Sequence, residues 1–216
     1  MPIQLDPFQV EAIRWIDQEH SVLVSAPTGA GKTLIAERAI ERALSKGENV
    51  IYTAPIKALS NQKFRDFRAV YENRVGILTG DVSINTDAAI LIMTTEIYRN
   101  LLFEDPKRVR KVGWVIFDEI HYLDDPERGT VWEEAILFSP REINILALSA
   151  TVPNVRQLGD WIESIHKRPI AVVEESRRVV PLHFFFQCQG KILDHMNRLR
   201  REGYFDREDW RLTSSQ

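Results

Sequence analysis

The sequence has almost no cysteine and no long apolar run, and each absence excludes a class of protein. Cys188 stands alone among 216 residues, so the chain cannot form an internal disulfide. No apolar stretch approaches the length of a membrane-spanning helix. The first residues lack the basic start and apolar stretch of a signal peptide. We therefore expect an intracellular, cytoplasmic protein with no membrane partner.

An excess of positive charge is also missing. The formal net charge is −3, so the average field does not attract nucleic acid, and any such binding must come from local groups. Hydrophobic residues make up 44% of the chain and charged residues 27%, which is typical of soluble globular proteins. The length suffices for one large domain with a substantial core but is tight for two.

Apolar, β-branched runs alternate with helical patterns along the chain. This alternation predicts an α/β fold, with a mostly parallel sheet and helices on both faces. The strands are expected at residues 22–25, 50–54, 75–78, 90–94, 114–118, 145–149, 170–173 and 182–186. The rhythm weakens after the seventh run, and a charged helix is expected around residues 191–201. We therefore expect one domain over residues 1–186 and a connector with a helical tail over residues 187–216.

A phosphate-binding loop follows the first expected strand and precedes a helical stripe. Its residues are Ala26, Pro27, Thr28, Gly29, Ala30, Gly31, Lys32 and Thr33. The two glycines let backbone N–H groups surround a phosphate, and the helix N-terminus adds positive potential. Lys32 is expected to reach the β- and γ-phosphates, and the Thr33 hydroxyl to hold Mg²⁺. The alternative, a glycine-rich turn without function, does not explain why strand and helix flank the loop.

An acidic motif, Asp118-Glu119-Ile120-His121, follows another apolar strand. Open α/β sheets bind ligands at this end of their strands. We expect Asp118 to hold Mg²⁺ and Glu119 to act as the general base toward the attacking water. His121 is either an ordinary residue at a strand end or a hydrogen-bonding link to the next motif.

That next motif is Ser149-Ala150-Thr151, at the end of the following strand. Three such residues are common by chance, and a capped helix start after Pro153 is the alternative interpretation. Their position, one strand after the acidic motif, indicates that Ser149 and Thr151 couple the nucleotide site to the rest of the domain.

Together these motifs resemble the DExH-box helicases of superfamily 2, and most closely the superkiller and exosome-cofactor RNA helicase family. Further matching stretches are residues 5–9, 54–63, 79–81, 94–100, 122–134 and 148–154. The stretch after the acidic motif is the most specific, because DEAD-box proteins have Ala and Asp after the Asp-Glu pair. The departure of Ala26 from the usual first glycine also fits this family. The resemblance implies the first RecA-like P-loop NTPase domain, with ATP and Mg²⁺ as cofactors.

The resemblance also implies a track for single-stranded nucleic acid, with RNA preferred. The contacts would come from Pro55, Lys57, Gly80, Asp81, Thr94, Thr95 and Arg99. Contacts to phosphate and sugar carry little sequence information, so weak base preference is expected. A solvated helix face is the alternative for Lys57, Gln62 and Lys63.

Phe8 and Gln9 match the adenine-recognition position of related helicases. A ring there stacks on the base, and an amide reads its edge, so Gln9 is expected to favour ATP over GTP. Phe8 is equally well explained as a core residue beneath the first helix, packed with Ile13 and Ile16.

A helicase motor also needs arginines from a second RecA-like domain, and no such arginine motif follows Thr151. Because these arginines contribute about 10³–10⁵ in rate, we expect the chain alone to bind nucleotide weakly and hydrolyse it slowly. The alternatives to an RNA helicase domain are a DNA helicase or translocase domain and a regulatory nucleotide-binding module that does not unwind. A P-loop kinase leaves the acidic motif and Ser149-Ala150-Thr151 unexplained.

Overall fold

The computed structural model describes residues 5–125, 129–177, 186–188 and 191–193. The chain divides into two compact units, Met1–Arg177 and Arg178–Gln216. In the second unit, β9 (Phe186–Cys188) pairs with β10 (Lys191–Leu193) in an antiparallel hairpin. The helix expected from residue 191 is therefore a strand at its first three residues, and residues 194–201 lie outside the described part.

The first unit is built on one eight-stranded sheet. Its strands are β1 (Ser21–Ser25), β2 (Asn49–Ala54), β3 (Val75–Leu78), β4 (Ser83–Ile84), β5 (Ile90–Thr94), β6 (Val112–Asp118), β7 (Asn144–Ser149) and β8 (Ile170–Glu174). They lie in the order β4-β3-β5-β2-β6-β7-β1-β8, and all neighbours are parallel except β3 and β4. Seven of the eight expected strands are present. The eighth, at 182–186, lies outside the described residues except Phe186, which begins β9.

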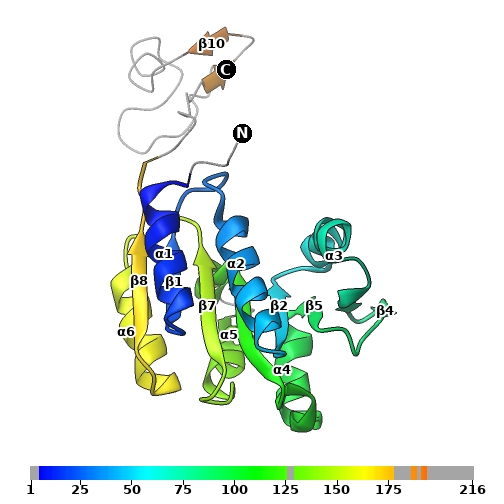
Figure 1. Ribbon diagram of the computed structural model, residues 1–216. Coiled ribbons are helices and arrows are strands. Elements are labelled where there is room, and N and C mark those ends of the chain that lie inside the picture. Colours follow the sequence, from blue (N-terminus) through cyan, green and yellow to red (C-terminus); the bar gives the residue numbers. More distant parts are fainter. Residues whose placement is uncertain (1–4, 126–128, 178–185, 189–190, 194–216) are drawn as a thin grey trace. The chain divides into compact units, whose positions relative to one another are not determined.

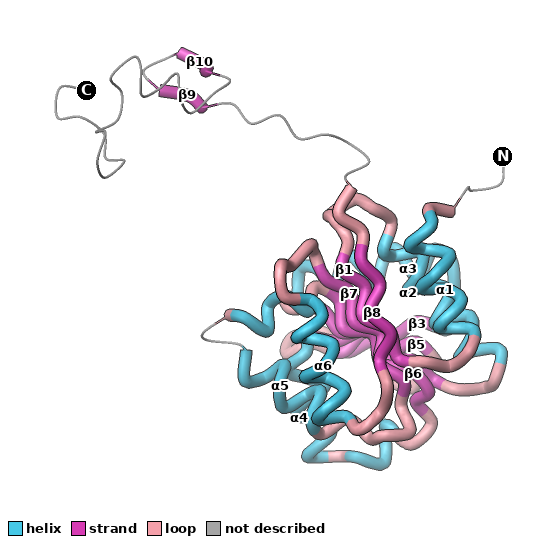
Figure 2. Tube along the Cα trace, turned by 90° about the vertical axis from the view of Figure 1, so that its left-hand side faces the viewer, coloured by secondary structure: helices cyan, strands magenta, loops and turns pink. Residues whose placement is uncertain are grey.

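Helices cover both faces of the sheet (Figures 1 and 2). On one face lie α1 (Pro7–Asp17), α2 (Lys32–Ser45) and α3 (Lys57–Tyr71), and on the other α4 (Thr95–Glu104), α5 (Gly129–Leu137) and α6 (Val155–His166). Three short 3-10 helices are η1 (Glu72–Arg74), η2 (Pro106–Val109) and η3 (Ile120–Asp124). The expected α/β fold is confirmed. No helix in the described part of the chain has the length and apolar character that a membrane span needs.

The sheet has a separate hydrophobic core on each face, because successive side chains of a strand point to opposite sides. In β1, Val22 and Val24 belong to the core beneath α1, α2 and α3, whereas Leu23 belongs to the core beneath α4, α5 and α6. All five residues of β1 are buried. Burial on both faces explains why the strands are continuous apolar runs rather than alternating ones.

The short strand β4 has no counterpart in the sequence-based prediction. It pairs with β3 at the edge of the sheet through Ile77–Ile84 and Leu78–Ser83, and both of its residues are exposed. Two exposed residues cannot produce a hydrophobic period, so the hairpin has no signal in the sequence.

Parallel pairing brings the carboxyl ends of the strands to one edge of the sheet. The phosphate loop follows β1, the acidic motif closes β6, and Ser149 closes β7, which lies between β1 and β6. The register places Ser25 beside Ser149 and Asp118 beside Leu148. Motifs far apart in the sequence thus meet at one edge, as expected for an open α/β sheet.

Candidate functional site

The phosphate loop depends on backbone conformations that favour glycine. Gly29 and Gly31 have φ angles of +84° and +82°, in the left-handed region that costs other residues energy. A Cβ on Gly31 would lie 2.6 Å from Nε2 of Gln9. The loop therefore needs glycine at Gly31 for both its conformation and its packing.

Lys32 lies folded over the loop that it follows. Its ammonium donates to the carbonyl oxygens of Ala26 at 2.8 Å and Pro27 at 3.2 Å. Burial lowers the pKa of Lys32, and the nearby carboxylates of Glu119 and Asp118 oppose that shift. The lysine of the loop and the acidic motif therefore share one electrostatic environment, as catalysis on a phosphate requires.

Gln9 braces the phosphate loop from α1. Its Nε2 donates to the carbonyl oxygens of Ala30 and Gly31, both at 3.2 Å, and its Oε1 accepts from the backbone N–H of Asp6 at 2.9 Å. Phe8 is only 4% exposed and belongs to the core beneath α1. This placement is the one that the core interpretation of Phe8 requires. Gln9, which was expected to read the edge of adenine, has its amide hydrogen-bonded to the phosphate loop.

The acidic motif is held by a tyrosine that the sequence analysis did not single out. The hydroxyl of Tyr52 donates to Oδ2 of Asp118 at 2.5 Å. Burial, and then the charge of Asp118, raise the pKa of Tyr52 well above its ordinary value, so the phenol stays protonated and remains a donor. The signal in the sequence was a phenol within the apolar strand β2, which pairs with β6.

Lys63 is a second residue whose place was not anticipated. From α3, its ammonium donates to the hydroxyl of Thr33 at 3.0 Å and lies 3.9 Å from Oδ2 of Asp118. Its side chain is 15% exposed, whereas Gln62 beside it is exposed. The alternative of a solvated helix face, weighed for both residues, therefore fits Gln62 and does not fit Lys63.

Glu119 and His121 connect the acidic motif with the end of β7. Glu119 has a φ of +59°, unusual for a residue other than glycine. Nδ1 of His121 lies 3.4 Å from a carboxylate oxygen of Glu119 and 3.5 Å from the backbone nitrogen of Ala150, which points its N–H toward the ring. His121 therefore lies between the acidic motif and Ser149-Ala150-Thr151, where a hydrogen-bonding link between the two motifs would have to lie.

Serine side chains close the paired strands β1 and β7. The hydroxyl of Ser25 donates to the carbonyl of Ala150 at 3.3 Å and accepts from the N–H of Val152 at 3.4 Å. The hydroxyl of Ser149 is buried and has no hydrogen-bond partner within the described residues, and Thr151 is exposed. The sequence analysis missed Ser25, because a serine closing an apolar strand carries no distinctive signal.

A cavity of about 540 Å³ lies beside the ends of β2 and β5. Its lining comprises Pro55, Ile56, Lys57, Ala58, Gly80, Thr94, Glu96 and Ile97. Four of the seven residues expected on the nucleic-acid track are among these. Asp81 adjoins the cavity through its ion pair with Lys57, at 3.1 Å, and the hydrogen bond from Lys57 lowers the pKa of Asp81.

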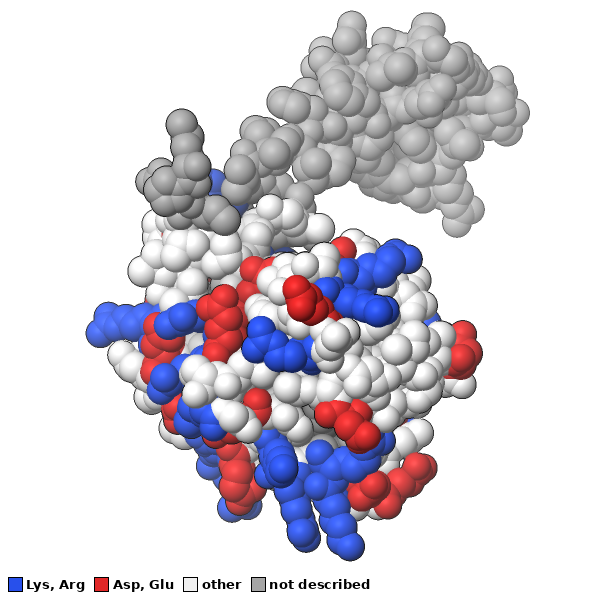
Figure 3. Space-filling model, turned by 45° about the vertical axis from the view of Figure 1, so that its right-hand side comes forward, with Lys and Arg blue, Asp and Glu red and all other residues white. Residues whose placement is uncertain are grey.

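The other two expected contacts do not line this cavity. Thr95 is fully buried. Arg99 forms an ion pair with Glu134 of α5, at 2.9 Å. On the face shown in Figure 3, basic and acidic side chains are interspersed and do not form a broad basic band. This face therefore carries no broad basic surface, and Lys57 is a single cation beside the cavity.

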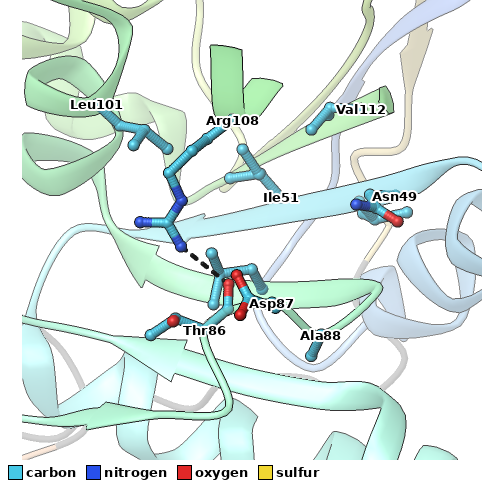
Figure 4. A pocket seen from close by; sticks show the side chains of 10 residues that line it. Asn49, Ile51, Thr86, Asp87, Ala88, Leu101, Arg108 and Val112 are labelled. Atoms are coloured by element: carbon cyan, nitrogen blue, oxygen red, sulfur yellow. Dashed lines mark hydrogen bonds between the residues drawn. The ribbon is translucent and has the colours of Figure 1, made fainter. Parts of the chain in front are cut away.

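A smaller cavity, of about 150 Å³, lies at the opposite edge of the sheet (Figure 4). It is bordered by the starts of β2 and β6, and Arg108 reaches across it to donate to the carbonyl of Thr86 at 3.0 Å. None of the expected site residues lines it. The chemistry is concentrated at the carboxyl edge.

Comparison with known proteins gives a consistent result. The family model described as DEAD/DEAH box helicase matches residues 6–158. The chain is 47% identical over 208 residues to ATP-dependent RNA helicase mtr4 of Schizosaccharomyces pombe, covering 94% of this chain and 18% of that protein. It is 51% identical over 190 residues to the human Exosome RNA helicase MTR4, covering 88% of this chain and 18% of that protein.

Two further matches concern a third relative and a solved structure. Human Superkiller complex protein 2 is 46% identical over 209 residues, covering 93% of this chain and 17% of that protein. A crystal structure of the DUF1998 helicase MrfA bound to DNA superimposes with a TM-score of 0.67 at 19% identity, covering 79% of this chain and 27% of that one. The latter shows a shared fold. The chain spans about a fifth of the length of these curated relatives.

Proposed function

Because the chain belongs to the DEAD/DEAH box helicase family, we propose that it is the ATP-binding and ATP-hydrolysing part of an RNA helicase of the superkiller and exosome-cofactor type. The observation that carries the proposal is the meeting of Lys32, Asp118 and Glu119 at one edge of the sheet. A second RecA-like domain of the same parent protein is proposed as the partner that completes the site.

The residues present fit a nucleotide-bound magnesium ion. One cation, the ammonium of Lys63, already lies between the hydroxyl of Thr33 and a carboxylate oxygen of Asp118. Oxygen ligands of this kind are those that Mg²⁺ prefers. Bound Mg²⁺ would neutralise charge on the β- and γ-phosphates. We propose Thr33 and Asp118 as the residues that hold it.

The remaining roles follow from charge and position. Lys32 stabilises the negative charge of the β- and γ-phosphates, and the N–H groups of residues 28–33 enclose them. Glu119 accepts a proton from the attacking water, and the neighbouring His121 relays the state of Glu119 to Ser149 and Thr151. Phe8 and Gln9 are proposed to select adenine.

The nucleic-acid track is proposed along the 540 Å³ cavity. RNA is preferred in this proposal because the similar curated proteins are named as RNA helicases. The contacts are proposed to come from Pro55, Lys57, Gly80, Asp81, Thr94, Thr95 and Arg99. Arg99 would have to leave Glu134 to make its contact. An intracellular, cytoplasmic location also remains a proposal.

The test of this function combines nucleotide and strand binding by the chain. A fluorescent ATP analogue should bind in the presence of Mg²⁺ and be displaced by ATP more effectively than by GTP. Single-stranded RNA should bind more tightly than DNA of the same sequence when a non-hydrolysable ATP analogue is present, because the 2′-hydroxyl distinguishes the two. Absence of nucleotide binding would overturn the proposal, and tighter binding of DNA would replace RNA by DNA as the substrate.

A further inference from the structure

We propose that Lys63 is a positioning residue that competes with the metal ion for Thr33 and Asp118, and so sets the magnesium concentration that nucleotide binding requires. The inference rests on the proposed function, because it concerns the same nucleotide site. It adds a residue of α3 to a site otherwise built from the phosphate loop and the acidic motif.

The first step is the geometry around the ammonium of Lys63. It lies 3.0 Å from Oγ1 of Thr33 and 3.9 Å from Oδ2 of Asp118, and 5.7 Å from the centre of the Tyr52 ring. The side chains of Lys63 and Asp118 are 15% and 11% exposed. A largely buried cation thus lies between the two residues proposed to hold the metal.

The second step concerns what these oxygens can accommodate. The hydroxyl of Tyr52 already donates to Oδ2 of Asp118, the same oxygen that faces Lys63. A divalent ion held by Thr33 and Asp118 would lie close to the ammonium, and two cations at such a distance repel one another in a poorly solvated site. Binding of the metal therefore requires Lys63 to move away.

The third step concerns what anchors Lys63. It lies on α3, and Phe64 and Phe67 of that helix pack in the core, with Phe67 edge-on to Tyr52 at 5.2 Å between ring centres. The helix is therefore held against the sheet, so displacement of the ammonium has to come from rotation of the long side chain of Lys63. The same helix begins at Lys57, on the proposed nucleic-acid track.

The experiment measures the Mg²⁺ dependence of nucleotide binding by the full chain. A fluorescent ATP analogue at fixed concentration is titrated with Mg²⁺ for the wild type, Lys63→Met, Lys63→Arg and Arg65→Met. Arg65 is the control, because it is an exposed cation on the same helix. Lys63→Met should reach half-saturation at a Mg²⁺ concentration about fivefold lower, the factor that corresponds to the attraction in water between two unit charges about 4 Å apart, such as Lys63 and Asp118. Lys63→Arg and Arg65→Met should resemble the wild type.

A second readout avoids nucleotide altogether. Binding of Mn²⁺ alone, followed by electron paramagnetic resonance, should be tighter in Lys63→Met than in the wild type, because the competing charge is gone. If Lys63→Met does not fold, as judged by urea unfolding, Lys63→Gln should give the same shift, since it keeps a donor for Thr33 without the charge.

The outcomes separate this inference from the proposed function. An unchanged Mg²⁺ requirement in folded, uncharged variants would overturn the inference and leave the function standing. A higher requirement would also overturn it, because Lys63 would then bind phosphate instead of competing with the metal. Failure of the wild type to bind nucleotide at any Mg²⁺ concentration would overturn both.

Discussion

At the scale of single residues, the site is a set of charges whose roles differ although they lie close together. Lys32 is half-buried and donates to the loop carbonyls, Asp118 accepts a hydrogen bond from Tyr52, and Glu119 contacts His121. Because these partners differ, removing the charge of Lys32 should affect nucleotide binding, and removing the charge of Glu119 should affect hydrolysis. Paired substitutions can therefore separate the two.

Glu119→Gln should retain nucleotide binding and abolish hydrolysis. The amide cannot accept a proton from water, whereas Thr33 and Asp118, the proposed holders of Mg²⁺, remain unchanged. Lys32→Ala should do the reverse and weaken nucleotide binding first. Hydrolysis is best measured on the chain joined to the proposed second RecA-like domain, and binding with a fluorescent ATP analogue. Loss of binding in Glu119→Gln would contradict the assignment of the base.

At the scale of elements, each helix end has its own electrostatic environment. His166, the last residue of α6, is buried, and its Nε2 lies 3.2 Å from the carbonyl of Pro140. Burial lowers the pKa of His166, Arg168 and Arg141 lower it further, and Glu142 and the carbonyl of Pro140 oppose the shift. The folded protein therefore holds this imidazole neutral at a pH where the unfolded chain protonates it.

This difference predicts a pH dependence of stability. Since the pKa of His166 is lower in the folded state, the contribution of its neutral imidazole to the free energy of unfolding is complete above about pH 6.5. As the pH falls below that value, this contribution is lost by at most about 1.4 kcal/mol per pH unit. The free energy of unfolding, measured by urea titration, should fall less steeply between about pH 7 and pH 5 in His166→Gln than in the wild type. Equal slopes would contradict the argument.

At the scale of the whole molecule, the charge distribution limits how nucleic acid can bind. The net charge is −3, and the surface in Figure 3 mixes both signs. The proposed strand would therefore be held by a few local contacts. Lys57, in the cavity and paired with Asp81, is the cation best placed to make one of them.

Lys57→Gln should therefore weaken binding of single-stranded RNA and reduce the slope of log affinity against log salt concentration by about 0.7, the value for one phosphate contact on a single strand. The measurement is fluorescence anisotropy over a range of salt concentrations. Lys107→Gln serves as the control, because this exposed lysine belongs to η2, next to the cavity at the opposite edge. An equal loss of slope in both variants would indicate binding by overall charge instead.

The amino-acid sequence by itself determined the α/β class, the places of seven strands in the first unit, and the motifs of the nucleotide site. These features are local: a buried strand is a short apolar run, and the loop of Gly29, Gly31 and Lys32 follows such a run directly. The family could be named for the same reason, since its motifs are contiguous stretches at strand ends.

Only the tertiary structure decided which side chains from distant segments meet. Tyr52 reaches Asp118 because β2 pairs with β6, and Lys63 reaches Thr33 because α3 packs on the same face as α2. Arg99 is engaged by Glu134 only because α4 and α5 are neighbours. Each of these contacts joins residues more than 25 positions apart, and strand order and helix packing, which no local pattern encodes, bring them together.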